Sequence, residues 1–580
     1  MGEKHQGITR RQVLAAAGAL SVGAITLRTS KAESTAKWDH ETDILVVGSG
    51  VGGATAAITA DQNGDSVMVL EKAFITGGTS IKSAGVLWIP NNFTLREKGI
   101  EDGEEDCLKY LARYSYPEHF NPADPQLGLA TGQFKLLKAF YTNASRAIDS
   151  LRRHGALKVA EWRMFQLDRS ATDYLDHVPE NKVPAGRALG PLKKDGTMGG
   201  GVDLMMQLGD AVKKRGIPLL INHRAKRLIL NPAGRAVGLE VESGDTVVAV
   251  KARKAVIFAT GGYAHNPEFV SLYQANRLWG SCAMPWSTGD FINIAGAAGA
   301  RMGNMSSAWR TQVLLEEALQ SSKLAAGVFF PPGDSMILVN RYGVRVVNEN
   351  RNYNDRTEVH GIYDASQGEF PNQLLFMIYD QRSAEAFAGV YPIPADPADT
   401  AHVLKGDSLQ GLAVRINQRL GQIAPQTGGV SLAPSFAGKL KKTINRFNGF
   451  ARSGKDEDFQ RGQAAYDSEW HQVFSPMRTD SGWPPNDGPS ITMYPFRHEG
   501  PYFAMIYAAG ALDTCGGPAI DSSARVLDTQ DQPIPGLYGA GNCIGSPSGE
   551  AYWGAGHTLG LSMTFGFIAA NAAHHEPRTK

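Results

Sequence analysis

Residues 42–73 read TDILVVGSGVGGATAAITADQNGDSVMVLEKA and have the order strand, glycine turn, helix, strand. The apolar run 44–47 is continuous, which is typical of a strand covered on both faces. Gly48, Gly50 and Gly53 follow with the spacing GxGxxG. The first glycine allows a tight turn, the second lets the backbone approach a pyrophosphate, and the third lets helix and strand pack closely. The stretch therefore predicts a dinucleotide-binding unit in an α/β fold.

The second strand of this unit, expected over residues 67–70, ends at Glu71. An acidic residue at this distance from the glycine turn binds a ribose hydroxyl in such units. The intervening helix offers N–H groups and the positive end of its dipole to the phosphates. The glycine spacing alone would be weak evidence, but with both strands, the helix and Glu71 it indicates a dinucleotide site strongly.

Three further glycine-containing segments indicate which dinucleotide is bound. Residues 72–85 (KAFITGGTSIKSAG) follow Glu71 directly, residues 252–266 (ARKAVIFATGGYAHN) contain a strand that ends in two glycines, and residues 534–545 (IPGLYGAGNCIG) place a short strand before another glycine turn. A nicotinamide-binding domain does not need these widely separated pieces. They resemble the signature of the FAD-containing family that includes the fumarate reductase and succinate dehydrogenase flavoproteins.

This resemblance implies a Rossmann-like, discontinuous FAD-binding domain, formed by residues 40–285 and 490–580. Residues 286–489 would form an inserted α+β catalytic or cap domain over the flavin ring. No histidine stands in residues 77–85, where some relatives attach FAD covalently. We therefore expect FAD to be bound non-covalently.

The composition excludes several other classes of protein. The 580 residues include 58 Lys and Arg against 57 Asp and Glu, and 42% are hydrophobic, as in a globular chain. A nucleic-acid-binding protein normally shows a basic excess, so we expect no nucleic acid partner. The four cysteines form no CxxC pair and are too few for a disulfide scaffold, so we expect neither a metal site nor such a scaffold.

The first residues differ from the rest of the chain. Arg10 and Arg11 precede an apolar stretch, residues 13–27, and a small-x-small sequence at residues 30–32. The stretch is short for a membrane span, which needs ~20 residues. We interpret residues 1–32 as a twin-arginine signal peptide, which predicts a periplasmic or otherwise exported protein, or a cytoplasmic one if the leader is not used. We expect no later membrane span.

Within the FAD family, the chain after the leader resembles 3-ketosteroid Δ1-dehydrogenases over most of its length. The resemblance is carried by residues 77–92 (GGTSIKSAGVLWIPNN), 500–517 (GPYFAMIYAAGALDTCGG) and 547–570 (PSGEAYWGAGHTLGLSMTFGFIAA). It implies an enzyme that introduces a C=C bond α,β to the ketone of a cyclic substrate, with a 3-ketosteroid as the expected substrate. Cap and pocket segments match less well, which leaves the substrate more open than the reaction.

The resemblance places the functional groups of that family at Tyr552, Gly556, Tyr353 and Tyr174. Removing two hydrogens beside a ketone requires a proton to leave one carbon and a hydride to leave its neighbour for flavin N5. The Tyr552 hydroxyl and the Gly556 N–H would stabilise the charge that forms on the ketone oxygen, as in an oxyanion hole. Tyr353 would be the base, and a hydrogen bond from Tyr174 would lower its pKa from the usual value near ~10. The absence of a side chain at Gly556 would let the ketone approach the backbone N–H closely.

We expect three other residues near these groups to have no chemical role. We expect His557 to cap or pack at the start of a helix. Tyr502 and Tyr507 alternate on a strand and would line the substrate pocket without taking part in the chemistry.

The resemblance also implies a set of residues that contact FAD, drawn from all four glycine-containing segments, from the helix near the C-terminus and from one further position, residue 225. They are Gly48, Ser49, Gly50, Gly52, Gly53, Glu71, Lys72, Gly77, Gly78, Thr79, Ser80, Ala84, Gly85, Ala225, Thr260, Gly261, Gly262, Gly541, Asn542, Thr558 and Leu559.

Other functions remain open at this point. An exported enoate reductase of the fumarate or urocanate reductase type would use an arginine acid, for which Arg351 and Arg356 are candidates. A flavin-bearing carrier without turnover is a second alternative, and a dehydrogenase of smaller cyclic ketones or of 5α-steroids at Δ4 is a third. For partners we expect a small hydrophobic ketone, an unknown electron acceptor such as a quinone, and a monomeric protein.

Overall fold

The first strand, helix and second strand of the chain form where the sequence predicts them. In the computed structural model, β1 (His40–Val47) and β2 (Val67–Leu70) pair in parallel on either side of α2 (Val51–Gln62) in the sequence. The last six residues of β1 are buried, as are all four of β2. Both strands are continuous apolar runs because both faces of this sheet are covered.

These strands belong to an eight-stranded sheet with the order β17-β18-β9-β1-β2-β6, in which β7 and β8 extend from β9. Its further strands are β6 (Leu219–Leu220), β7 (His223–Leu230), β8 (Ala236–Ser243), β9 (Thr246–Phe258), β17 (Arg525–Leu527) and β18 (Pro533–Gly539). β18 pairs in parallel with β9, although nearly three hundred residues separate them. The sheet therefore joins the two sequence ranges that were predicted to form one FAD-binding domain.

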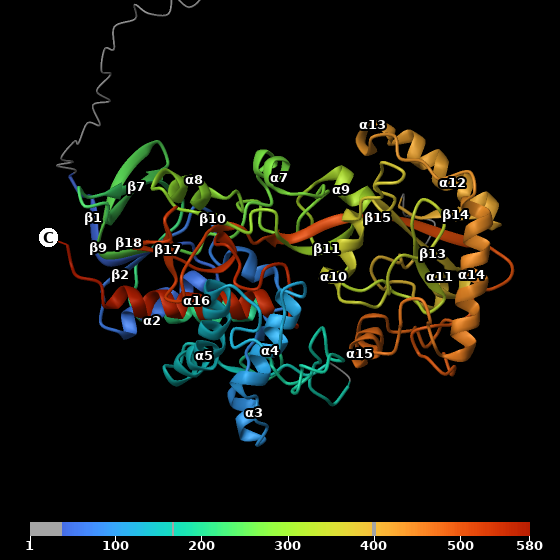
Figure 1. Cartoon of the computed structure of the whole chain (residues 1–580), viewed down its shortest axis with the longest axis horizontal. Helices are drawn as coiled ribbons and strands as arrows, with labels where there is room; N and C mark the ends of the chain where they lie inside the picture. The colour runs from blue at the N-terminus through green and yellow to red at the C-terminus, as the bar shows by residue number, and fades with distance from the viewer. Residues whose placement is uncertain (1–36, 165–166, 397–401, 580) are drawn as a thin grey trace, which may run out of the picture. The chain divides into compact units, whose positions relative to one another are not determined.

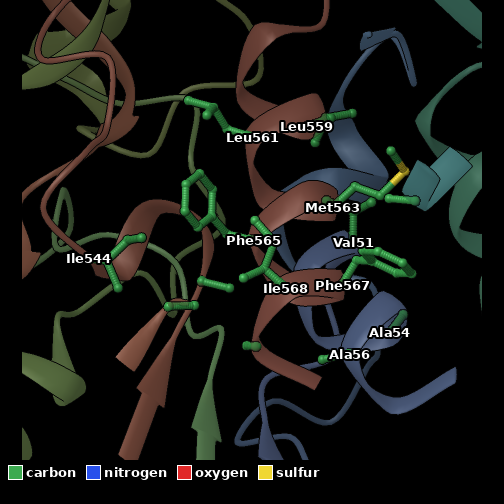
Figure 2. Packing of buried hydrophobic residues seen from close by; sticks show 14 of the residues in the cluster. Val51, Ala54, Ala56, Ile544, Leu559, Leu561, Met563, Phe565, Phe567 and Ile568 are labelled. Atoms are coloured by element: carbon green, nitrogen blue, oxygen red, sulfur yellow. The ribbon is translucent and has the colours of Figure 1, made fainter. Parts of the chain in front are cut away.

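Helix α16 (His557–His574) lies along α2 beside this sheet (Figure 1). Figure 2 shows Met563 and Phe567 on the side of α16 that faces α2, and Phe565 on the other side, toward Ile544. The helices come close where a Cβ atom on Gly566 would lie 2.3 Å from the carbonyl oxygen of Gly52. This packing holds the helix that carries the glycine turn.

A second, antiparallel sheet has the order β11-β15-β13-β12, with β14 also paired to β15. Its strands are β11 (Ala308–Leu314), β12 (Met336–Val339), β13 (Leu374–Asp380), β14 (Leu404–Gly406) and β15 (Tyr502–Thr514). β15 belongs to the sequence range 490–580 that we assigned to the FAD-binding domain, yet it pairs with strands of the range 286–489. Figure 1 shows β15 running between the two regions. The sheets therefore do not mark a boundary near residue 490.

The remaining elements pack around the two sheets. They are η1 (Gly78–Lys82), β3 (Leu87–Trp88), α3 (Phe93–Glu97), α4 (Glu104–Ser115), α5 (Thr131–Arg153), β4 (Val159–Glu161), β5 (Ala188–Pro191), α6 (Gly201–Lys214), α7 (Pro267–Tyr273), α8 (Asp290–Ala297), β10 (Met302–Gly303), α9 (Leu315–Gln320), α10 (Tyr353–Glu358), η2 (Val359–Gly361), α11 (Gln381–Ala386), α12 (Leu409–Gln422), α13 (Ala424–Thr427), α14 (Phe436–Ser453), α15 (Ala465–Phe474), β16 (Gly517–Pro518) and η4 (Gly541–Cys543).

The structure describes residues 37–164, 167–396 and 402–579. The signal peptide predicted for residues 1–32 lies outside these ranges. Among the described helices, none is both long and apolar enough to cross a bilayer.

Candidate active site

At two positions of the turn after β1, the surrounding backbone leaves no room for any residue larger than glycine. Gly48 has a φ of +103°, and a Cβ atom there would lie 2.3 Å from the carbonyl oxygen of Ala259. A Cβ atom on Gly53 would lie 1.9 Å from the carbonyl oxygen of Gly48. These two glycines allow α2 to start directly against the end of β1.

Gly50 is different, because the protein around it leaves room for a side chain. Its φ is −68°, which any residue adopts, and the nearest atoms to a Cβ would be Ser80 Oγ at 3.4 Å and the Gly77 carbonyl oxygen at 3.8 Å. A side chain here would instead enter the cavity at the N-terminus of α2. This open cradle at a helix N-terminus fits the pyrophosphate of a dinucleotide.

Glu71 is held in place at the end of β2. Its Oε2 accepts hydrogen bonds from the backbone N–H of Ser49 at 3.1 Å and from the Ser49 hydroxyl at 2.7 Å, and its Oε1 accepts from the Ala73 N–H at 2.9 Å. A carboxylate has about four lone-pair sites, so acceptor capacity remains for ribose hydroxyls. Next to it, the Lys72 ammonium bonds the Thr288 hydroxyl at 2.7 Å and Asp290 at 3.0 Å.

One continuous cavity runs from this carboxylate to the candidate tyrosines. Most residues predicted to contact FAD line it, namely Gly48, Ser49, Gly50, Gly52, Glu71, Lys72, Gly78, Thr79, Ser80, Ala84, Gly85, Ala225, Thr260, Gly261, Gly541, Asn542, Thr558 and Leu559. Three predicted residues do not line it. Gly53 lies beneath Gly48, the Gly77 N–H donates to the Ser49 hydroxyl at 3.0 Å, and the Gly262 N–H donates to Asp513 at 2.9 Å. These three glycines contact residues that line the cavity but do not line it themselves.

The three candidate tyrosines come together at the far end of the cavity. Tyr353 is the first residue of α10, Tyr174 lies in a loop after β4, and Tyr552 lies in the loop before α16. The Tyr174 and Tyr353 hydroxyls are 2.9 Å apart and hydrogen bonded. The ring of Tyr552 lies 5.4 Å from that of Tyr353 and 5.4 Å from that of Tyr174, centroid to centroid. All three side chains are buried and line the cavity.

Gly556 lies beside these phenols as the N-cap residue of α16. Its carbonyl oxygen accepts hydrogen bonds from the N–H groups of Trp88 and Gly560 at 3.1 and 2.9 Å, whereas its own N–H has no acceptor among the described residues. We expected glycine here so that a ketone can come close, but the structure gives another reason. The φ is +88°, and a Cβ would lie 2.5 Å from the backbone of Val86.

Burial dominates the electrostatics of the phenols. It raises the pKa of Tyr353 well above the ordinary value, and Tyr174 and Tyr552 raise that pKa further. This direction is opposite to the lowering that we expected, because burial disfavours the charged phenolate and neither neighbouring phenol offsets that effect. Burial also raises the pKa of Tyr552, and hydrogen bonds to Tyr353 and Thr558 oppose this shift.

Aromatic residues that the sequence analysis did not identify form the walls around the phenols. They are Trp162, Trp309, Phe329, Trp470 and Phe474. Four separate segments supply them, so no local motif contains them. A helical spacing of four residues joins Trp470 and Phe474, whose rings stack at 4.7 Å on α15, and this spacing was the one signal available in the sequence.

Other candidates lie outside the cavity lining. The strand residues Tyr502 and Tyr507 do not line it, so their expected place in the pocket wall is wrong. His557 is buried at the first position of α16, bonded to the Ser548 hydroxyl at 3.0 Å, as expected for a packing residue.

The arginines of the enoate reductase alternative are also absent from the cavity lining. Arg356 is fully buried and donates to the Gln312 side chain and the Val328 carbonyl, both at 2.7 Å. Arg351 lies 3.9 Å from Asp355, and neither arginine lines the cavity.

The glycine turn, the fixed carboxylate of Glu71 and the parallel sheet define a dinucleotide-binding protein of the α/β class. A family model described as FAD binding domain matches residues 43–559, and the chain belongs to this family. Its cofactor is FAD; that FAD is held without a covalent bond stays a prediction.

Known proteins resemble the chain over nearly its whole length. It is 31% identical to 4-oxocyclohexanecarboxylate 2-dehydrogenase of Sinomonas cyclohexanicum, over 91% of this chain and 92% of that protein. It is 30% identical to a 3-oxosteroid 1-dehydrogenase of Mycolicibacterium smegmatis, over 92% of this chain and 97% of that protein. The crystal structure of 3-ketosteroid Δ1-dehydrogenase from Sterolibacterium denitrificans, in complex with 1,4-androstadiene-3,17-dione, superposes with a TM-score of 0.75 at 26% identity, covering 92% and 99% of the two chains. The chain is an FAD-dependent oxidoreductase that acts on CH–CH groups.

Proposed function

We propose that the protein introduces a C=C bond α,β to the ketone of a six-membered ring, and that its substrate is a 3-ketosteroid desaturated at Δ1. The observation that carries the proposal is the meeting of three buried phenols, Tyr174, Tyr353 and Tyr552, with the Gly556 N–H at one end of the FAD cavity.

The names of two relatives support the ring ketone. In the names 4-oxocyclohexanecarboxylate 2-dehydrogenase and 3-oxosteroid 1-dehydrogenase, the position numbers put the new double bond between the α and β carbons of the ketone. Their substrates share a cyclohexanone ring and differ in what is attached to it. The aromatic walls of this cavity favour an apolar attachment such as the further rings of a steroid.

Each group at the site has one role in this reaction. Tyr552 and Gly556 donate hydrogen bonds to the ketone oxygen, which makes the neighbouring C–H more acidic. Tyr353, in its deprotonated form, removes the proton from the α carbon and becomes neutral, and Tyr174 donates a hydrogen bond that stabilises the phenolate of Tyr353 before this transfer. Bound FAD supplies the acceptor for the hydride from the β carbon.

Anaerobic flavin reduction tests the proposal directly. Purified protein is mixed with 3-ketosteroids, with 5α-steroids and with simple cyclohexanones, and bleaching of the flavin absorbance is followed. We expect 3-ketosteroids to bleach the flavin fastest and the product to carry the new bond at C1–C2, read by NMR. Faster bleaching by a one-ring ketone, or a Δ4 product, would replace the steroid Δ1 assignment while keeping the reaction.

Assays on the same purified protein distinguish the other candidate functions. Oxidation of reduced viologen by fumarate, with no response to any ketone, would indicate an enoate reductase instead. A flavin that no organic substrate reduces would indicate a carrier.

We also propose that the protein is exported through the twin-arginine route and passes its electrons to a quinone. The pair Arg10 and Arg11 before the apolar residues 13–27 supports the export route. A reporter fused to residues 1–36 should reach the periplasm, and should stay in the cytoplasm when both arginines are changed to lysine. Reoxidation of the reduced enzyme by a soluble quinone analogue tests the acceptor.

A further inference from the structure

A buried carboxylate that the proposed reaction does not use lines the FAD cavity. Asp513 is 1% exposed and lies near the end of β15. Its Oδ2 accepts hydrogen bonds from the Gly262 N–H at 2.9 Å and from the Asn542 side-chain amide at 3.3 Å, and its Oδ1 accepts from the Thr514 N–H at 2.9 Å. No ion pair joins it to a cation among the described residues. Burial raises the pKa of Asp513 to about 6.

Trp309 determines how Asn542 faces this carboxylate. The indole N–H of Trp309 donates to Asn542 Oδ1 at 3.0 Å. An indole nitrogen can only donate, so the amide oxygen must face Trp309 and the amide nitrogen must face Asp513. The orientation of the Asn542 amide is therefore fixed by chemistry.

The two sheets of the fold bring these residues together. Trp309 on β11 and Asp513 on β15 are direct cross-strand partners, while Asn542 belongs to η4, directly after β18 of the parallel sheet. The Trp309 ring also meets Tyr552 edge-to-face, with centroids 5.8 Å apart. One chain of contacts thus connects the FAD cavity wall to a candidate catalytic phenol.

The chemistry of the carboxylate indicates which part of FAD it meets. A carboxylate repels phosphate but accepts hydrogen bonds from hydroxyl groups. Asn542 links the carboxylate to Trp309, and Trp309 contacts Tyr552, which places the carboxylate on the phenol side of the glycine turn. Of the groups between the pyrophosphate and the flavin ring, the ribityl chain carries hydroxyls.

We propose that Asp513, Asn542 and Trp309 act as one positioning unit, in which Asp513 and Asn542 hold the ribityl hydroxyls of FAD and Trp309 fixes Asn542 while packing against Tyr552. Only the contribution to Tyr552 rests on the proposed function; the contribution to FAD binding does not.

The test measures FAD affinity and the potential of bound FAD, neither of which needs a substrate. For Asp513→Asn we expect the Kd for FAD to rise about tenfold or more, because a hydrogen bond to a charged group is lost. We also expect the equilibrium between oxidised and reduced FAD to shift about tenfold toward the reduced form, which is about 30 mV for two electrons, because a negative charge near the flavin is removed. Asp380→Asn is the matched control, since Asp380 is equally buried, bonded to N–H and hydroxyl groups, and absent from the cavity lining.

A second variant keeps the test decisive if Asp513→Asn does not fold. Trp309→Phe keeps an aromatic ring but releases the Asn542 amide, and we expect it to weaken FAD binding several-fold. The double variant should bind FAD no more weakly than Asp513→Asn alone, because both act through one unit. Wild-type affinity and potential in folded Asp513→Asn, or wild-type affinity in Trp309→Phe if the first variant does not fold, would overturn the proposal. If the effects of the two substitutions on FAD affinity add in the double variant, the three residues do not act as one unit.

Discussion

The Tyr552 hydroxyl is the most direct test of the proposed chemistry at the level of one residue. Tyr552→Phe keeps the ring that packs against Tyr174 and Trp309 and removes one donor to the ketone oxygen. We expect the rate of flavin reduction by a ketosteroid to fall ~10²–10³-fold, as for the loss of one oxyanion donor. Anaerobic stopped-flow absorbance measures the rate, and the visible spectrum shows that FAD is retained.

The control for this variant is another buried phenol. Tyr502 donates to the Arg497 carbonyl at 3.0 Å and does not line the cavity. Tyr502→Phe should therefore leave the rate unchanged. Equal rates in wild type and Tyr552→Phe would remove Tyr552 from the mechanism.

The pKa of Tyr353 predicts how the reaction depends on pH. A base acts only in its deprotonated form, and burial raises the pKa of this phenol well above the ordinary value. Below that raised pKa the deprotonated fraction grows about tenfold per pH unit. We therefore expect kcat/KM to rise with pH across the range 7–9 without a plateau.

Two variants separate this effect from others. Tyr353→Phe should abolish the rise together with most of the activity, and Tyr174→Phe should keep the rise at a lower rate, because Tyr174 acts through its hydrogen bond to Tyr353. A plateau that begins below pH 8 would show that the bound substrate or FAD lowers the Tyr353 pKa, or that another group is the base.

At the level of elements, the contact between α2 and α16 links packing to cofactor binding. A Cβ on Gly566 would lie 2.3 Å from the carbonyl oxygen of Gly52, in the first turn of α2. Gly566→Ala should therefore push the helices apart, lower the free energy of unfolding by about 1–3 kcal/mol and weaken FAD binding. Denaturant unfolding and FAD titration measure the two effects.

The matched control is a helical glycine without neighbours. Gly449 lies inside α14, and nothing approaches within 4 Å of a Cβ placed there. Gly449→Ala should stabilise the protein by about 0.5–1 kcal/mol through helix propensity and leave FAD binding unchanged. A Gly566→Ala protein as stable as wild type would mean that α16 can shift without cost.

At the level of the whole molecule, the sequence predicted the parts whose signal is local. The turn at Gly48, Gly50 and Gly53 and the carboxylate of Glu71 lie within one stretch of 30 residues, and the fold class follows from them. The tyrosines were placed by resemblance to a family rather than by any local pattern.

The remaining features depend on contacts between distant segments, which a single sequence does not reveal. The role of Gly556 depends on the backbone of Val86, and the pairing of β15 depends on strands of the insert. The pKa of Tyr353 depends on its burial and on the charges of two neighbouring phenols. In each case the residue type is visible in the sequence, but its environment is formed only by folding.

The last prediction concerns the whole chain, because residues from both ends of it line the cavity in which we expect FAD to bind. A ligand that binds only the folded state stabilises it by ~2.7 kcal/mol at 100 times its Kd. Adding FAD should therefore raise the midpoint of thermal unfolding, measured by tryptophan fluorescence. Gly50→Ser should abolish this rise without lowering the midpoint in the absence of FAD, because serine is a good N-cap residue and its Cβ has room in the protein but fills the cradle. Gly53→Ser is the contrast, since its Cβ would lie 1.9 Å from the carbonyl oxygen of Gly48 and should lower the midpoint with or without FAD. A Gly50→Ser protein that FAD still stabilises as much as wild type would show that the pyrophosphate does not lie in this cradle.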